Sequence, residues 1–201
     1  MPLTLISWIV VGLLLVTSVG LLLSRDWRWS LGFLAAQYLG MFWLVTLHWP
    51  FGLASVKLVT GWMASATLGV TRLGMSEREQ ADESAWPQGH PFRLFAAALV
   101  VILVIAATPQ VEIMIPGISR PVIVGGLLLA GMGLLHLGIT AEILRITLGL
   151  LTVLAGFEIL YATVETSILL AGLLAIVNLG LALAGAYLMT AAPQEEAEEA
   201  E

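Results

Sequence analysis

The chain has no cysteine and carries very little charge. Without cysteine it can form no disulfide and no site built on thiolates, such as an iron–sulfur cluster or a thiolate zinc site. Only 11% of its 201 residues are charged, whereas 59% are hydrophobic, and the mean hydropathy is +0.99. So few polar residues cannot cover the exterior of a water-soluble domain. The composition therefore predicts an integral membrane protein.

Sequence signatures of catalysis are also missing. We find no phosphate-binding glycine loop, no nucleophile elbow and no cluster of metal ligands. His48 and His136 are expected near opposite faces of the membrane, so they cannot ligate one haem together, and interface histidines are usually solvated. We therefore expect no enzymatic activity from the chain on its own, although a role as a subunit of a membrane oxidoreductase stays open. We expect no cofactor, no metal and no nucleic-acid partner.

Long apolar runs are the feature that the sequence does have. Each run is long enough to cross a bilayer core of about 30 Å as a helix. We predict an all-α, polytopic fold with seven transmembrane helices at Leu3–Leu23, Trp29–His48, Gly52–Thr71, Phe92–Thr108, Pro121–Ile139, Ala141–Val164 and Ser167–Met189. Five prolines are expected at span ends, where a missing N–H does least harm: Pro50, Pro91, Pro109, Pro116 and Pro121. The first segment lacks a basic start and a cleavage site, which favours a retained span.

The basic residues predict the orientation. Those near the odd-numbered loops are Arg25, Arg28, Arg72, Arg78, Arg93 and Arg145. The even-numbered loops hold only Arg120, with Lys57 slightly inside the third span. Because basic loops stay in the cytoplasm, we expect the N-terminus outside, the C-terminus in the cytoplasm, and a multi-pass protein of the cell membrane.

Residues 1–190 are expected to form a single transmembrane domain. Arg28–Leu34 (RWSLGFL) resembles Arg145–Leu151 (RITLGLL), which suggests two three-helix units, 3–73 and 121–189, joined by span 92–108. Coincidence among leucines and glycines explains the similarity equally well. The polar segment 74–91 is interpreted as a linker or a docking loop. The acidic stretch 191–201 is expected to be a disordered tail.

Glu158 is the most informative residue, because it lies in the apolar stretch Leu148–Leu160. A carboxylate at membrane depth is costly and is usually kept for a function. Small and polar residues follow it at helical spacing, which predicts a face that packs against other helices. The members of this face are Thr152, Ala155, Glu158, Ala162 and Glu165. Two interpretations stay open: Glu158 holds helices together by hydrogen bonds, or it takes up and releases a proton.

Four further residues complete the predicted proton or ion path: Lys57, Asn178, Glu165 and Gln37. At 1.5 Å per residue, Lys57 and Glu158 are each about 10 Å from the same face, so they can meet if their helices are neighbours. The alternative, slightly favoured, is that Lys57 extends to the interface on its long stem. Asn178 lies about 19 Å deep by the same measure, too deep to contact Glu158. Glu165 is expected to be solvated near the interface, and Gln37 lies in the middle of the second span.

The last three spans resemble a known family. Gly156–Val164 (GFEILYATV) resembles the G-L-E-I-M-x-N-A-V core of the small K-type subunit of respiratory complex I, and is similar to the corresponding subunits of multisubunit cation/proton antiporters and membrane-bound hydrogenases. Gly180–Leu183 and Ala186–Tyr187 are similar to the end of that family's third helix. The resemblance implies that Glu158 is the carboxylate of a polar proton path. Ile176 stands where the family has a second glutamate, and the first four spans have no counterpart in the three-helix subunit.

Three functions are compatible with these features. The leading one is a non-catalytic integral membrane subunit of a proton- or sodium-translocating redox or antiporter-type complex, with Glu158 as the protonatable group. The second is a structural or assembly subunit of a respiratory or photosynthetic membrane complex. The third, a self-contained carrier, is ranked last because such carriers have helices broken at mid-membrane. The expected partners are the lipid bilayer and other integral membrane subunits.

Overall fold

The computed structural model describes residues 2–75 and 89–199, and the regular structure in these ranges is helical. The helices are α1 (Pro2–Leu23), α2 (Trp27–Thr46), α3 (Phe51–Gly74), α5 (His90–Met114), α6 (Arg120–Gly138), α7 (Ile143–Tyr161) and α8 (Ile168–Glu199). Each of these seven described helices contains a segment long and apolar enough to cross a membrane. The protein thus has the all-α architecture of a multi-pass membrane protein.

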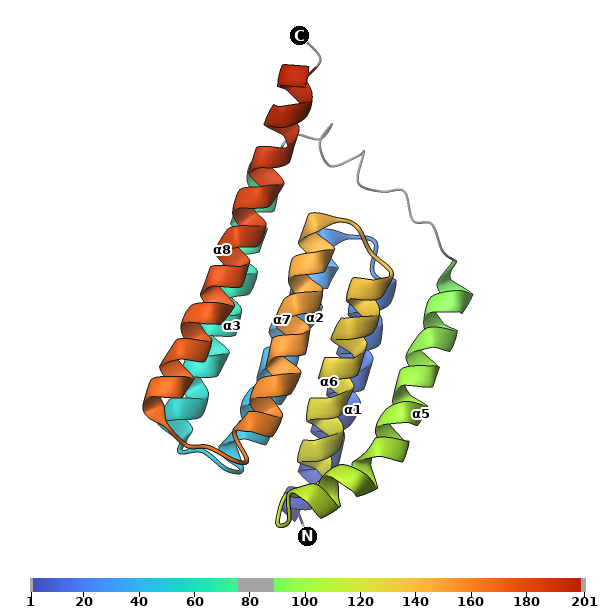
Figure 1. The fold of residues 1–201 in the computed structure, drawn as a ribbon, viewed down its shortest axis with the longest axis vertical. Helices are drawn as coiled ribbons and strands as arrows, with labels where there is room; N and C mark the ends of the chain where they lie inside the picture. Colours follow the sequence, from blue (N-terminus) through green and yellow to red (C-terminus); the bar gives the residue numbers. More distant parts are fainter. Residues whose placement is uncertain (1, 76–88, 200–201) are drawn as a thin grey trace.

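Successive helices alternate in direction, so the two ends of the chain lie at opposite ends of the bundle (Figure 1). We call the end where α1 begins the N-terminal face, and the end where α8 finishes the C-terminal face. The α2–α3, α5–α6 and α7–α8 connections lie at the N-terminal face. The assignment of these faces to the outside and to the cytoplasm stays a prediction from the basic residues, and Arg78 lies outside the described residues, as does most of the 74–91 loop.

The bundle has two layers of three helices and a seventh helix at one edge. Helices α1, α2 and α3 form one layer, and α6, α7 and α8 form the other. Each helix of the first layer packs against its counterpart in the second: α1 against α6, α2 against α7, and α3 against α8. Helix α5 packs on α6 and touches α1. The order of helices is therefore repeated between layers, although no finding tests a common origin of the two units.

Glycines allow α6 and α7 to approach each other closely. A Cβ atom on Gly156 would lie 2.6 Å from the carbonyl oxygen of Gly126, and one on Gly133 would lie 2.7 Å from the backbone nitrogen of Val153. Small residues at such positions let transmembrane helices pack backbone to backbone, which gains dispersion energy where no hydrophobic effect operates between helices. This contact fixes the position of α7, the helix that carries Glu158.

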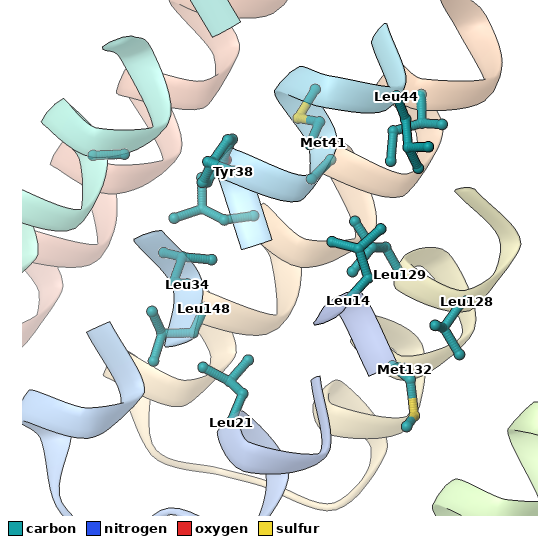
Figure 2. Close-up of a cluster of buried hydrophobic side chains, with 14 of the residues drawn as sticks. Leu14, Leu21, Leu34, Tyr38, Met41, Leu44, Leu128, Leu129, Met132 and Leu148 are labelled. Carbon is teal, nitrogen blue, oxygen red and sulfur yellow. The ribbon is translucent and has the colours of Figure 1, made fainter. Parts of the chain in front are cut away.

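An apolar core fills the space between the layers. Leu14, Leu34, Met41, Leu44 and Leu129 are each fully shielded, and Figure 2 shows them converging from α1, α2 and α6. Large apolar side chains also cover the outer surface, as expected where lipid replaces water. The buried polar residues of the helices are therefore surrounded by apolar side chains.

The helix limits differ from the sequence prediction in two informative places. Pro109 lies inside α5 and not at a span end, because the helix continues to Met114. Helix α8 continues through the acidic stretch as far as Glu199 and does not end near Met189, whereas the predicted disorder of this stretch stays a prediction. Alanine and glutamate are good helix formers, and extending an existing helix requires no new nucleation. The other limits agree within a few residues.

Candidate functional site

Lys57 and Glu158 form an ion pair inside the bundle. The Lys57 ammonium, on α3, donates to Glu158 Oε1, on α7, at 2.6 Å, and each side chain is only 1% exposed. Lys57 is the chain's only lysine. The extension of Lys57 to the interface, which the sequence analysis slightly favoured, is therefore wrong. The alternative, a meeting of the two residues at one depth, is what the structure shows.

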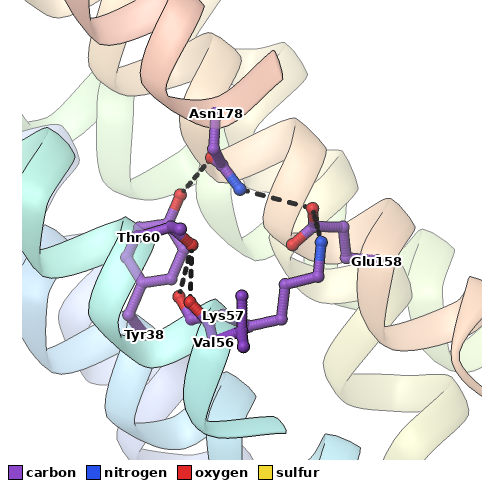
Figure 3. A network of polar contacts seen from close by, with 6 residues as sticks. All are labelled: Tyr38, Val56, Lys57, Thr60, Glu158 and Asn178. Carbon is purple, nitrogen blue, oxygen red and sulfur yellow. Dashed lines mark hydrogen bonds and ion pairs between the residues drawn. The ribbon is translucent and has the colours of Figure 1, made fainter. Parts of the chain in front are cut away.

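The pair spans the centre of a group of four helices. In this group α2 packs on α3 and α7, and α8 also packs on α3 and α7. Helices α3 and α7 are thus diagonal to each other, and the long lysine side chain crosses the space between them (Figure 3). Because both residues lie near the N-terminal face on their helices, their side chains reach the same level.

Asn178 and Tyr38 complete this network from the other two helices. Asn178 Nδ2, on α8, donates to Glu158 Oε1 at 3.3 Å, and the Tyr38 hydroxyl, on α2, donates to Asn178 Oδ1 at 2.7 Å. Both residues are completely buried. The chemistry fixes the amide orientation, since a carboxylate only accepts and the amide NH₂ must therefore face it. We call Tyr38, Lys57, Glu158 and Asn178 the buried network (Figure 3).

The contact between Asn178 and Glu158 corrects the prediction that they are too far apart in depth. The Cα–Cβ bonds of a helix tilt toward its N-terminus. Because α7 and α8 are antiparallel, Glu158 leans away from the N-terminal face and Asn178 leans toward it. The connection is also longer than the predicted span limits of Val164 and Ser167 imply, since α7 ends at Tyr161 and α8 begins only at Ile168. Counting residues measured the depth of backbones and ignored the direction of side chains.

Tyr38 was not among the residues predicted for the proton or ion path, although it directly follows Gln37 in the sequence. Its ring fills the space over Gly61 on α3, where any Cβ would collide with it. Gly61 lies one turn after Lys57, so it opens room for the ring beside the lysine. In the sequence, Gly61 one turn after Lys57 indicated open space beside the lysine, but the sequence does not indicate which side chain fills that space.

Glu158 Oε2 has no hydrogen-bond partner among the described residues, although it is buried. Oε1, in contrast, accepts from both Lys57 and Asn178. A carboxylate oxygen retains two acceptor positions, so Oε2 is where an incoming proton or a cation would bind. The two oxygens of this one group therefore have different roles, one held by donors and one available.

Gln37 belongs to a second, smaller polar group. Its Nε2 donates to Ser18 Oγ on α1 at 2.9 Å, and its Oε1 accepts from Thr152 Oγ1 on α7 at 3.2 Å. No hydrogen bond between described residues joins this group to the buried network. Gln37 and Tyr38 are nevertheless consecutive on α2, so the two groups lie side by side at mid-bundle.

Glu165 is not brought into either group. It is exposed in the connection before α8, as expected, and its Oε1 accepts from the backbone N–H groups of Thr166 and Ser167 at 3.1 Å each. Its carbonyl oxygen accepts from the Trp49 indole at 2.9 Å. These contacts anchor the α7–α8 connection, which gives Glu165 a local structural role. Its predicted part in an ion path stays a prediction.

The two candidate histidines differ in surroundings. His48 lies in the α2–α3 connection, where burial lowers the pKa of its imidazole below the ordinary 6.5 and keeps it neutral at pH 7. His136, expected to be solvated, is in fact buried at 2% exposure near the C-terminal face. Within residues 2–75 and 89–199 no three histidine, aspartate or glutamate side chains are grouped closely enough to hold a metal ion.

Compared with known protein families, with curated proteins and with solved structures, the chain matches none. The resemblance to the K-type subunit therefore rests on the motif residues alone. What these residues do must be argued from the geometry of the buried network.

Proposed function

We propose that the protein is a non-catalytic integral membrane subunit that carries protons or sodium ions within a larger translocating complex, with Glu158 as the protonatable group. One observation carries this proposal: the Lys57–Glu158 pair lies inside a bundle of apolar helices with both side chains 1% exposed. The resemblance of residues 156–164 to the K-type subunit supports the same function.

The free energy of burying two charges favours a functional role for the ion pair over a purely stabilising one. Removing two charges from water costs several kcal/mol per ion, and replacing a buried pair by apolar residues is often neutral or stabilising by about 1–4 kcal/mol. A chain that needed only helix contacts would gain as much from leucines or small residues. A lysine and a glutamate at this depth therefore support the proposal that their charges are used.

The arrangement can hold a variable number of protons. When one proton is bound between the Lys57 amine and the Glu158 carboxylate, it is on Lys57, and the site is an ammonium–carboxylate pair of zero net charge. A second proton entering at Oε2 makes Glu158 a neutral acid and leaves Lys57 as a lone buried cation, a costly state that returns the proton readily. A sodium ion at Oε2 would produce a similar excess charge. The site can thus act as a relay in which the ion pair is the resting state and the loaded state is transient.

A structural or assembly subunit is the alternative, and the network itself gives it support. Each of four helices contributes one residue, so these polar contacts also join helices. In that case the charge of Glu158 would matter only through its hydrogen bonds. Replacing Glu158 by an apolar residue would then weaken association with partners and leave transport by the remaining complex unchanged.

Glu158→Gln in the native membrane tests the proposal. The amide keeps the size and an acceptor for Lys57 but cannot be ionised. We expect proton or sodium uptake by energised membrane vesicles to fall by about a hundredfold, as when a proton-transferring group is removed, while the complex still co-purifies intact. Glu112→Gln is the matched control, since it neutralises a partly exposed glutamate outside both the network and the predicted ion path. Undiminished uptake by the Glu158→Gln complex would remove the proposal.

A further inference from the structure

A membrane-facing groove lies between α1, α5 and α6, away from the buried network. It has a volume of about 580 Å³ and is lined almost entirely by apolar groups. These include the side chains of Trp8, Val104 and Leu128, together with Gly12. This volume falls within the range of ligand sites, about 300–1,000 Å³. At its N-terminal end the groove reaches an ion pair, Glu112 with Arg120.

The groove follows from two local features of the chain. Proline removes a backbone hydrogen bond and can bend a helix. Pro109 lies inside α5, and the last part of α5 bends toward the α5–α6 connection (Figure 1). Pro109 therefore gives the carbonyl of Ile105, which also lines the groove, no N–H to accept from. Gly12 supplies the second feature, since a Cβ there would meet no atom within 4 Å. The groove is therefore open beside Gly12.

The ion pair places one positive and one negative side chain at the end of the groove. Arg120 Nε contacts both carboxylate oxygens of Glu112 at 3.1 Å, with the two side chains 68% and 36% exposed respectively. The pair lies where α5 ends and α6 begins, so an apolar tail in the groove would place its polar head at this pair. A phosphate fits the guanidinium, and an ammonium fits the carboxylate.

We infer that this groove binds one zwitterionic phospholipid of the phosphatidylethanolamine type. One acyl chain fills the space between α1, α5 and α6, the phosphate lies on Arg120, and the ammonium lies on Glu112. An anionic lipid offers the phosphate but no ammonium, so its net charge faces the Glu112 carboxylate. Charge complementarity therefore selects the headgroup, whereas the apolar lining accepts the chain.

Binding is measured by native mass spectrometry of the purified full chain in detergent, titrated with phosphatidylethanolamine or phosphatidylglycerol. We expect one phosphatidylethanolamine to be retained in preference to phosphatidylglycerol. Gly12→Leu adds a four-carbon side chain to the groove and should lower this retention by about tenfold or more, because a misfit of a single methylene in an apolar site already has an effect of that size. Gly32→Leu is the matched control, because a Cβ on Gly32 also meets no atom within 4 Å but lies on α2, outside the groove.

Glu112→Gln supplies a second test that does not depend on groove packing. Removing this exposed carboxylate should shift the preference toward phosphatidylglycerol by a similar factor. Equal retention of the two lipids by the unmodified chain would overturn the inference. So would equal retention of phosphatidylethanolamine by the Gly12→Leu and Gly32→Leu variants. So would tight dimerisation or co-purification of another subunit that Gly12→Leu abolishes, because the groove would then be a helix interface. None of these results depends on ion transport, so the lipid site and the proposed function fail separately.

Discussion

Lys57→Met isolates Glu158 inside the bundle, and its cost can be worked out. Removing one partner of a buried pair typically destabilises a protein by about 3–5 kcal/mol, because the remaining charge has no compensation. Glu158 can avoid this by binding a proton. An ordinary glutamic acid titrates near 4.3 and each pH unit is worth about 1.36 kcal/mol, so holding it neutral costs roughly 4 kcal/mol at pH 7 and about 1 kcal/mol at pH 5.

The sign of the pH dependence follows from proton counts. Between pH 5 and 7 the unfolded chain of the variant has an ionised Glu158, whereas the folded chain holds it protonated. The folded state then binds more protons, so its stability falls as the pH rises. The unmodified pair exchanges no proton in this window, since Lys57 and Glu158 are charged whether the chain is folded or unfolded. The loss relative to wild type should therefore grow by roughly 3 kcal/mol from pH 5 to pH 7.

Equilibrium unfolding in mixed dodecylmaltoside and dodecyl sulfate micelles, repeated at pH 5, 6 and 7, measures this difference. The double variant Lys57→Met/Glu158→Leu is the control, because it removes both charges and should be close to wild type or more stable at every pH. A single-variant loss that is the same at pH 5 and pH 7 would refute the reasoning. It would mean that Glu158 reaches water or another base in the folded chain.

Two further substitutions test how the buried network is held together. Gly61→Val inserts a side chain where the Tyr38 ring lies, so we expect the free energy of unfolding to fall by about 1–3 kcal/mol in the same assay. Gly52→Val is the control, because it lies on the same helix with open space at its Cβ, and it should lower the free energy of unfolding by less than half as much. Tyr38→Phe leaves Asn178 Oδ1 without its donor and should cost about 1 kcal/mol while slowing ion uptake less than Glu158→Gln does; a larger effect on uptake than Glu158→Gln would make the tyrosine, and not the carboxylate, the group that carries the ion.

The sequence predicts the spans well because length and hydropathy decide whether a helix can cross a bilayer, and both are local properties. It also predicts that Glu158 is buried and that Lys57 lies at the same depth. These two inferences required only the distance of each residue from a common face. The choice between a paired and an extended lysine required knowledge of which helices surround it, and this depends on contacts across more than a hundred residues of sequence.

The remaining network residues depend on side-chain geometry that spacing does not contain. Asn178 reaches Glu158 because antiparallel helices direct their side chains toward each other along the membrane normal. Tyr38 reaches Asn178 because Gly61, on a third helix, leaves room for its ring. The groove beside α5 has the same origin, since Pro109 was read as the end of a helix and is in fact a bend within one. Each case combines elements that are distant in sequence.

The position of the buried network in the two-layer fold links its charge to the packing of the layers. Tyr38 and Lys57 come from the first layer, and Glu158 and Asn178 come from the second. The two strongest contacts, Lys57 with Glu158 and Tyr38 with Asn178, both cross between layers. Protonating Glu158 removes the charge that holds Lys57, and so weakens an attraction between the layers. Inside the second layer it affects the hydrogen bond that Glu158 accepts from Asn178. An ion that loads this site would therefore loosen one layer against the other, and a partner packed on both layers would sense that change.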